Sequence, residues 1–219
     1  MPKTHNTDVV CPHCGKDSSA VIMERFNAGE DAELLPALKD RSIFIHICPE
    51  CQKPTYLDYN FLYEDEESRI AVWYASTPEE EETAKIGAKT MALARRIEEP
   101  WLIRVVLGWA EFGEKLQILE DGLDDRLVEI MKLLVVNEFV SKHGDYTLDG
   151  IFYGRLSDGK AAFLMTQNGK LLAASAFTNE HYAAVRKAME QRLPSLREDE
   201  PVINADRMYE RLQEMGVIR

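Results

Sequence analysis

The sequence predicts an α+β fold, and three observations point to it. Two C-P-x-C pairs, at residues 11–14 and 48–51, are joined to short runs rich in β-branched and aromatic residues, which are typical of strands. Signals for capped helices begin at Thr77. Two turn dipeptides, Asp158-Gly159 and Asn168-Gly169, then mark a second group of short strands. Strands and helices in separate blocks are the pattern of an α+β protein.

The part of the chain before Thr77 predicts mainly strands. We expect strands over 20–26, 42–47, 55–63 and 69–74, with a short helix limited by Pro36 between the first two. The acidic turn E-D-E-E-S separates the last two runs, which together predict a hairpin.

Helices dominate the middle of the chain. Thr77-Pro78-Glu79-Glu80 predicts a helix start, because it supplies an N-cap, a proline at the first helical position and a glutamate three residues after the cap. A strand over 101–107 follows. Apolar residues at helical spacing then predict helices over about 109–120 and 123–142, separated at Gly122.

The last third predicts a three-stranded meander followed by two helices. The two turn dipeptides separate the runs I-F-Y-G-R-L, A-A-F-L-M-T and L-L-A-A-S-A-F, and Thr178 caps a helix over 179–191. A closing helix from Asn204 to Met215 ends at Gly216. We place a boundary at His143-Gly144, with a cysteine-containing domain over 1–143 and a smaller α+β module over 144–219.

Composition narrows the classes of protein. The 219 residues carry a net charge of -12, and clustered basic residues of the kind that bind nucleic acid are missing. Neither a secretory signal nor a membrane-spanning run is found, so we expect a cytoplasmic protein that neither crosses membranes nor binds nucleic acid. In that compartment four cysteines favour metal ligands or reactive thiols over disulfides.

The four cysteines predict one zinc site made by Cys11, Cys14, Cys48 and Cys51. Two C-x-x-C knuckles supply the four soft thiolates that tetrahedral zinc takes, and the 33 residues between Cys14 and Cys48 add little loop-closure cost. We therefore expect an elongated Cys₄ zinc ribbon with antiparallel strands. Since four thiolates leave no open position for water, the predicted Zn²⁺ is structural, one per chain.

Other chemistries for the knuckles stay open. C-P-H-C also occurs as a redox dithiol, which needs a helix after the pair, whereas a strand pattern follows here. His13 and His46 are substitute ligand candidates. Gly15 suits a turn through positive φ after the first knuckle, but Gln52 stands at the matching position, so that turn is either strained or shaped differently.

The chain resembles the bacterial and archaeal CpXC family. The resemblance rests on C-P-H-C-G, C-P-E-C, Y-L-D-Y-N-F-L-Y-E-D-E-E-S-R-I-A-V-W-Y, R-V-V (104–106) and E-K-L-Q-I-L-E-D-G-L-D-D-R-L-V-E (114–129), and covers roughly residues 9–140. It implies a domain defined by two C-P-x-C motifs that binds zinc, with no established activity. Gln52 departs from the glycine often found after such knuckles.

Two further groups of residues could carry function. Aromatic residues crowd the predicted hairpin, where core packing is favoured over base stacking because acidic side chains stand beside them. Five carboxylates follow later in the chain: Glu120, Asp121, Asp124, Asp125 and Glu129. They predict helix capping, with Mg²⁺ binding or acid/base catalysis as the alternative.

These features favour a zinc-binding adaptor module for a protein partner, and not an enzyme, because catalytic motifs are missing. One alternative is an enzyme with an acidic site near 120–129 or in a cleft between the two parts. Another is a zinc ribbon that binds nucleic acid in transcription. Neither the partner nor an oligomeric state can be predicted.

Overall fold

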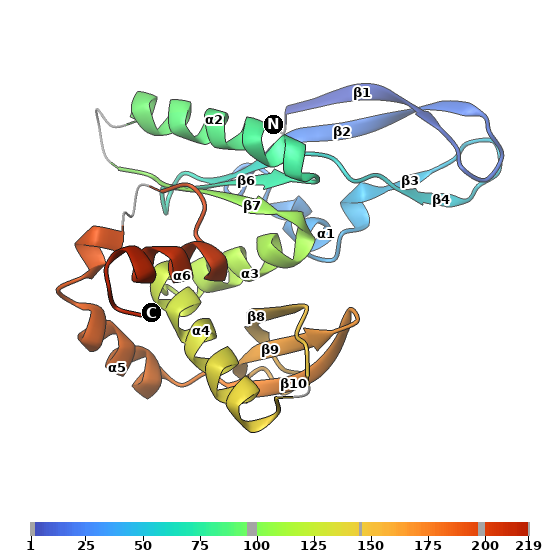
Figure 1. Cartoon of the computed structure of the whole chain (residues 1–219). Coiled ribbons are helices and arrows are strands. Elements are labelled where there is room, and N and C mark those ends of the chain that lie inside the picture. The colour runs from blue at the N-terminus through green and yellow to red at the C-terminus, as the bar shows by residue number, and fades with distance from the viewer. Residues whose placement is uncertain (1–2, 96–99, 145, 197–199, 219) are drawn as a thin grey trace. The chain divides into compact units, whose positions relative to one another are not determined.

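The computed structural model describes residues 3–95, 100–144, 146–196 and 200–218 (Figure 1). It is an α+β structure, as the sequence predicts. The chain divides into two compact units, and the division falls between Trp109 and Ala110. None of the helices in the described ranges is long and apolar enough to cross a membrane.

The first unit is built on a mixed five-stranded sheet in the order β1-β2-β5-β6-β7. Its elements are β1 (Lys3–Val10), β2 (Asp17–Asn27), α1 (Leu35–Lys39), β3 (Ile45–Ile47), β4 (Pro54–Tyr56), β5 (Phe61–Asp65), β6 (Ile70–Ala75), α2 (Pro78–Arg95) and β7 (Leu102–Leu107). The β2–β5 and β6–β7 pairs are parallel, and the expected β5–β6 hairpin is antiparallel. Strands β3 and β4 form a separate two-stranded sheet.

Two ribbons leave this sheet as an arm, the cysteine arm, made of residues 3–24 and 45–56. Strand β2 pairs with β5 only from Arg25 to Asn27, so the rest of β2 is bonded to β1 alone. Figure 1 shows the β1–β2 and β3–β4 ribbons extending together from the sheet. A hydrogen bond of 2.9 Å between Ser18 Oγ and His46 Nε2 joins them.

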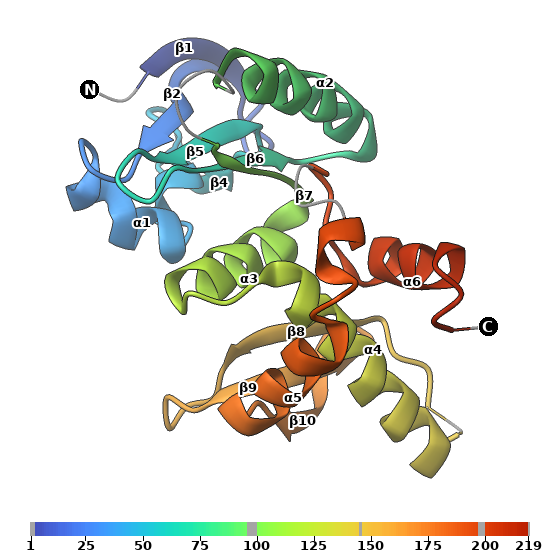
Figure 2. The same ribbon diagram turned by 90° about the vertical axis from the view of Figure 1, so that its left-hand side faces the viewer.

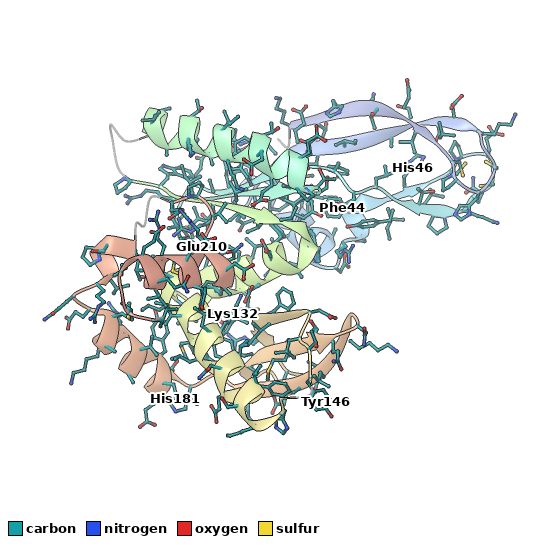
Figure 3. All side chains as sticks on the ribbon, in the orientation of Figure 1. Phe44, His46, Lys132, Tyr146, His181 and Glu210 are labelled. Carbon is teal, nitrogen blue, oxygen red and sulfur yellow. The ribbon has the colours of Figure 1, made fainter. Side chains whose placement is uncertain are left out.

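Phe44 is the centre of an aromatic cluster at the base of the arm (Figure 3). Its ring centroid lies 5.1 Å from that of Tyr59, 5.6 Å from that of Phe61 and 5.4 Å from that of Trp109. Phe44 itself is 2% exposed. The expectation that the aromatic residues of this region pack into a core is therefore supported here.

Two strand predictions in the first unit need correction, and one strand was missed. Residues 42–44 form a 3₁₀ turn and not the start of a strand, because Arg41 adopts a φ of 68° and swings Phe44 into the core. The run 55–63 is broken over residues 57–60, where the chain passes from the β3–β4 sheet to the five-stranded one. Strand β1 was not predicted, since K-T-H-N-T-D-V-V has few apolar residues.

The second unit holds the predicted helices and meander. Its elements are α3 (Gly108–Glu120), which begins just before the boundary, α4 (Asp125–Lys142), β8 (Gly150–Arg155), β9 (Ala161–Gln167), β10 (Lys170–Ala176), α5 (Asn179–Met189) and α6 (Ala205–Glu214). The meander is antiparallel in the order β10-β9-β8 (Figure 2). Asp124, Thr178 and Asn204 cap the helices that follow them, each by accepting a hydrogen bond from a backbone N–H.

Helix α4 is central to the second unit, which contains residues on both sides of the boundary expected at His143-Gly144. Val128 and Met131 pack in one apolar cluster with residues of the meander. Leu127 and Ile130 pack in a second cluster with residues of α5 and α6. Both faces of α4 are covered by later parts of the chain, and the compact unit that contains them begins at Ala110.

Candidate metal centre

The first cysteine pair lies in the loop of the β1–β2 hairpin. Val10 pairs with Asp17, so residues 11–16 make the connection. The N–H of Gly15 donates to the carbonyl of Cys11 at 2.9 Å, and the N–H of Cys11 donates to the carbonyl of Lys16 at 2.9 Å. Gly15 turns through a φ of 68°, which glycine adopts without a Cβ penalty. The loop is closed by its own backbone, and this sets the two sulfur atoms on one side.

The second pair repeats that loop in the β3–β4 hairpin. Ile47 pairs with Pro54 and leaves residues 48–53 as the connection. The N–H of Gln52 donates to the carbonyl of Cys48 at 2.9 Å, and the N–H of Cys48 donates to that of Lys53 at 3.1 Å. The two knuckles therefore share one backbone hydrogen-bond pattern.

Gln52 adopts the conformation that was expected to need glycine. Its φ is 58°, close to the 68° of Gly15, so the second turn has the shape of the first and carries a left-handed non-glycine residue. The side-chain amide of Gln52 donates to the carbonyl of Pro49 at 2.9 Å, which offsets part of that cost. The sequence left two possibilities for this turn, a strained turn or a differently shaped one. The prediction of a different shape is wrong, because the two turns match.

The two loops bring all four sulfur atoms together at the far end of the cysteine arm (Figure 3). Every pair of Sγ atoms lies within 4.8 Å. Two of these separations join the two loops: Cys11 to Cys51 at 3.6 Å and Cys14 to Cys48 at 3.8 Å. Four sulfurs around a metal at about 2.3 Å have edges of about 3.8 Å, so this donor set fits one tetrahedral ion.

The four thiols do not have the geometry that a redox dithiol needs. All four cysteines are free, and the close contacts run between the loops. Strand β2 begins at Asp17, directly after the first loop, so no helix N-terminus follows the pair to activate a thiolate. Cys11 and Cys48 are 2% and 0% exposed, while the second cysteine of each loop is more accessible.

The electrostatics of the cluster favour a bound cation. Burial acts to raise the pKa of the Cys11 thiol, but hydrogen bonds with the backbone of His13 and Cys14 outweigh it and hold this pKa at about 6. A backbone hydrogen bond at Lys16 acts to lower the pKa of Cys14, but desolvation and the other thiols raise it to about 12. Four thiolates at this distance repel one another, and a metal ion removes that repulsion.

The two histidines near the cluster have other partners. Nε2 of His13 donates to the carbonyl of Pro54 at 3.2 Å and so ties the first loop to the strand after the second. His46 is bonded to Ser18 in the middle of the arm. Among the described residues, the group of histidine, cysteine or acidic side chains placed to hold a metal consists of the four cysteines alone.

The five carboxylates at 120–129 do not converge on one point. Asp124 caps α4 by accepting from the N–H of Arg126 at 3.0 Å, which confirms capping at that residue. Asp121 accepts from the hydroxyl of Tyr153 at 2.6 Å and pairs with Arg155. Asp125 and Glu129 point into the second unit instead, where lysines meet them.

Those lysines build a buried ionic network. Lys132 Nζ lies 3.0 Å from Glu114 Oε1 and 2.7 Å from Glu129 Oε2. Lys115 Nζ lies 3.0 Å from Asp125 Oδ2. All five side chains are at most 5% exposed.

Backbone groups complete this network. Lys115 donates to the carbonyl of Ile203 at 2.8 Å, and Glu114 accepts from the N–H of Tyr153 at 2.5 Å. The network therefore ties α3 and α4 to the segment before α6 and to β8. Burial raises the pKa of Glu129 to about 7, although Lys132 opposes the shift. This geometry indicates that the network holds the helices together, since each of its charged groups faces a partner within the protein.

The sequence analysis did not predict that the two knuckles lie in hairpin loops of equal length. A signal for this match was present in C-P-H-C-G-K-D and C-P-E-C-Q-K-P, which have matching lysines after the second cysteine. Sequence reasoning also missed Tyr153 and Arg155 as partners of Asp121. No local signal links residues so far apart along the chain.

Comparison with known proteins identifies one family. The family model described as CpXC protein matches residues 9–132, which is more than half of the 219-residue chain. The match contains both cysteine loops and ends within α4. No curated protein and no solved structure matches the chain.

Proposed function

The chain belongs to the CpXC family, and on that basis we propose that its four cysteines hold one structural Zn²⁺ and that the cysteine arm is a rigid platform for a protein partner. The observation that carries the metal assignment is the approach of four Sγ atoms to within 4.8 Å, from two loops with the same backbone hydrogen bonds.

Zinc suits this donor set better than other divalent ions. Thiolate ligands select soft or borderline metals, and a tetrahedral set of four sulfurs is typical of zinc or of iron. Four protein ligands leave no position for water or substrate, so the ion would stabilise the arm and would not catalyse a reaction. The residues that would hold it are Cys11, Cys14, Cys48 and Cys51.

Elemental analysis of protein purified under reducing conditions tests the metal. We expect about one equivalent of zinc per chain, no visible absorption, and four titratable thiols only after a chelator is added. A strong visible absorption would identify iron in its place. Less than half an equivalent of either metal, with four thiols free from the start, would contradict the proposal.

One face of the β3–β4 ribbon supports the platform role. Ile45 pairs with Tyr56, and Ile47 pairs with Pro54, so these four side chains share a face. Ile45, Ile47 and Tyr56 are 47%, 50% and 41% exposed. The opposite face carries His46, which is bonded to β2. The apolar face is therefore exposed to solvent near the four cysteines, while His46 on the opposite face holds the ribbon against β2.

Charge indicates the kind of partner. The chain carries a net charge of -12, which attracts basic proteins and repels nucleic acid at low salt. We propose a partner segment with apolar side chains that cover Ile45 and Ile47 and with basic residues around them. Its binding would combine burial of the apolar face with salt-sensitive association.

Capture experiments test this proposal when they compare the protein with a variant of the apolar face. Full-length zinc-loaded protein should retain a basic partner that the double variant Ile45→Ser/Ile47→Ser does not retain. Val21→Ser is a matched control, since Val21 is a 65% exposed valine on β2. Retention should fall as salt rises. A captured protein that the double variant retains equally well would contradict the face as the docking site.

A further inference from the structure

A cleft of about 320 Å³ lies within the second unit. It is formed by the loop between α3 and α4, strands β8 and β9, and the segment from the end of β10 to the first residue of α5. Neither the metal site nor the proposed platform uses it. Its volume is at the lower end of the range for small-molecule sites, so it suits a small ligand.

Opposite charges stand side by side on one wall of the cleft. Asp121 accepts from the Tyr153 hydroxyl at 2.6 Å and pairs with the guanidinium of Arg155. A second NH group of Arg155 donates to the carbonyl of Gly159 at 3.1 Å. The guanidinium is thus held in place by two acceptors, yet the Arg155 side chain is 43% exposed.

The lining of the cleft also contains apolar side chains. Phe177 and Leu123 supply them, and the ring of Phe177 packs against Tyr153 at 5.0 Å and Tyr182 at 6.0 Å between centroids. These contacts fix an aromatic surface beside the charged pair. Asn179 adds an exposed side-chain amide at the rim.

This combination selects one class of ligand. A simple carboxylate would face repulsion from Asp121, and a simple amine would face repulsion from Arg155. A molecule with both groups satisfies both charges, because guanidinium binds carboxylate in a planar fork and a carboxylate accepts from ammonium. The Arg155 side chain is 43% exposed, so its pair with Asp121 is weakened by solvent and a ligand that offers both charges can replace it.

We propose that the cleft binds a small zwitterion with an apolar side chain, of the α-amino acid type. Arg155 would hold the carboxylate, Asp121 the ammonium group, and Phe177 with Leu123 the side chain.

Titration of the full-length, zinc-loaded protein tests this, with binding followed by calorimetry and by NMR. L-Phenylalanine and L-leucine are the probes, and 3-phenylpropionate and phenethylamine each lack one charge. We expect the amino acids to bind at least about tenfold more tightly than either analogue. Arg155→Met and Asp121→Asn should each weaken binding about tenfold or more. Arg186→Met is the matched control, because Arg186 is an exposed arginine on α5 that does not line the cleft.

Three results would overturn the proposal: no binding of either amino acid at about 10 mM, equal binding of 3-phenylpropionate, or unchanged binding by Arg155→Met. If Arg155→Met or Asp121→Asn alters the circular dichroism spectrum, Ala161→Leu provides a second test. Ala161 lines the cleft, so a larger side chain there narrows the cleft and leaves both charges in place. Unchanged affinity in Ala161→Leu would place the ligand elsewhere.

Discussion

The cysteine arm and the second unit are stabilised in different ways. The outer part of the arm consists of two-stranded ribbons, which are marginal in water by themselves, and many of its apolar side chains, such as Val10, Val21 and Ile47, are largely exposed. The second unit buries two apolar clusters around α4. One chain therefore has a region with four clustered thiols and many exposed apolar side chains, and a region with two buried apolar clusters.

The buried charges of the second unit sharpen that contrast. Lys115 and Lys132 satisfy three carboxylates inside the unit, where an unpaired charge costs several kcal/mol. In the arm the corresponding groups are the four thiols, which lie within 4.8 Å of one another. An internal lysine balances charge in one region, and a metal ion is proposed to do so in the other.

Metal removal should separate the two regions most clearly. Chelation, or the variant Cys48→Ser, removes binding energy on the order of 10 kcal/mol that is coupled to folding of the arm. Hydrogen exchange should accelerate strongly over residues 3–24 and 45–56 and stay nearly unchanged over the meander strands 150–176. Equal acceleration in both regions would show that the arm is not the element that the metal stabilises.

Loss of one buried lysine should destabilise the second unit and leave the cysteine arm unchanged. Lys132→Met leaves Glu114 and Glu129 buried without their shared cation, so we expect unfolding to become about 3–5 kcal/mol easier. Denaturant unfolding measures the loss, and zinc content should not change. Lys142→Met is the control on the same helix, because its pair with Glu138 is more than half exposed and is worth under about 1 kcal/mol. Equal losses in the two variants would argue against the network.

The pH dependence of the second unit should carry the signature of Glu129. Because its folded pKa is raised to about 7 from 4.5, the folded state binds the proton more tightly than the unfolded state does. This contribution is complete below pH 4.5 and is lost as the pH rises through 7. Relative to Glu129→Gln, the wild type should lose up to about 1.4 kcal/mol per pH unit in that window. Urea unfolding at several pH values measures the difference, and a parallel pair of curves would refute it.

The smallest expected effect compares the two knuckles. Gln52→Gly removes a left-handed non-glycine residue, so the free energy of unfolding of the metal-bound arm should rise by about 0.5–1 kcal/mol, less the bond from Gln52 to Pro49. Gly15→Ala should lower it by about 1 kcal/mol at the matching position. Competition with a chelator reports both as changes in zinc affinity. A loss of affinity in Gln52→Gly would mean that the side-chain bond outweighs the backbone cost.

Sequence reasoning worked where the signals were local. The caps at Asp124, Thr178 and Asn204, the two turn dipeptides of the meander and the four cysteines were all recognisable from a few neighbouring residues. It was wrong over 42–44, where Phe44 has the β propensity of a strand residue but packs in an aromatic cluster with residues far along the chain.

The sequence by itself determined the α+β class, the family and the donor set, because residue types and short spacings carry that information. Only the tertiary structure decided that both knuckles are matched hairpin loops, that α4 belongs to the second unit, and that Asp121 meets Tyr153 and Arg155 beside a cleft. Those facts depend on contacts between residues distant in the chain. Such contacts are set by how all the apolar surfaces pack at once, which no short stretch of sequence contains.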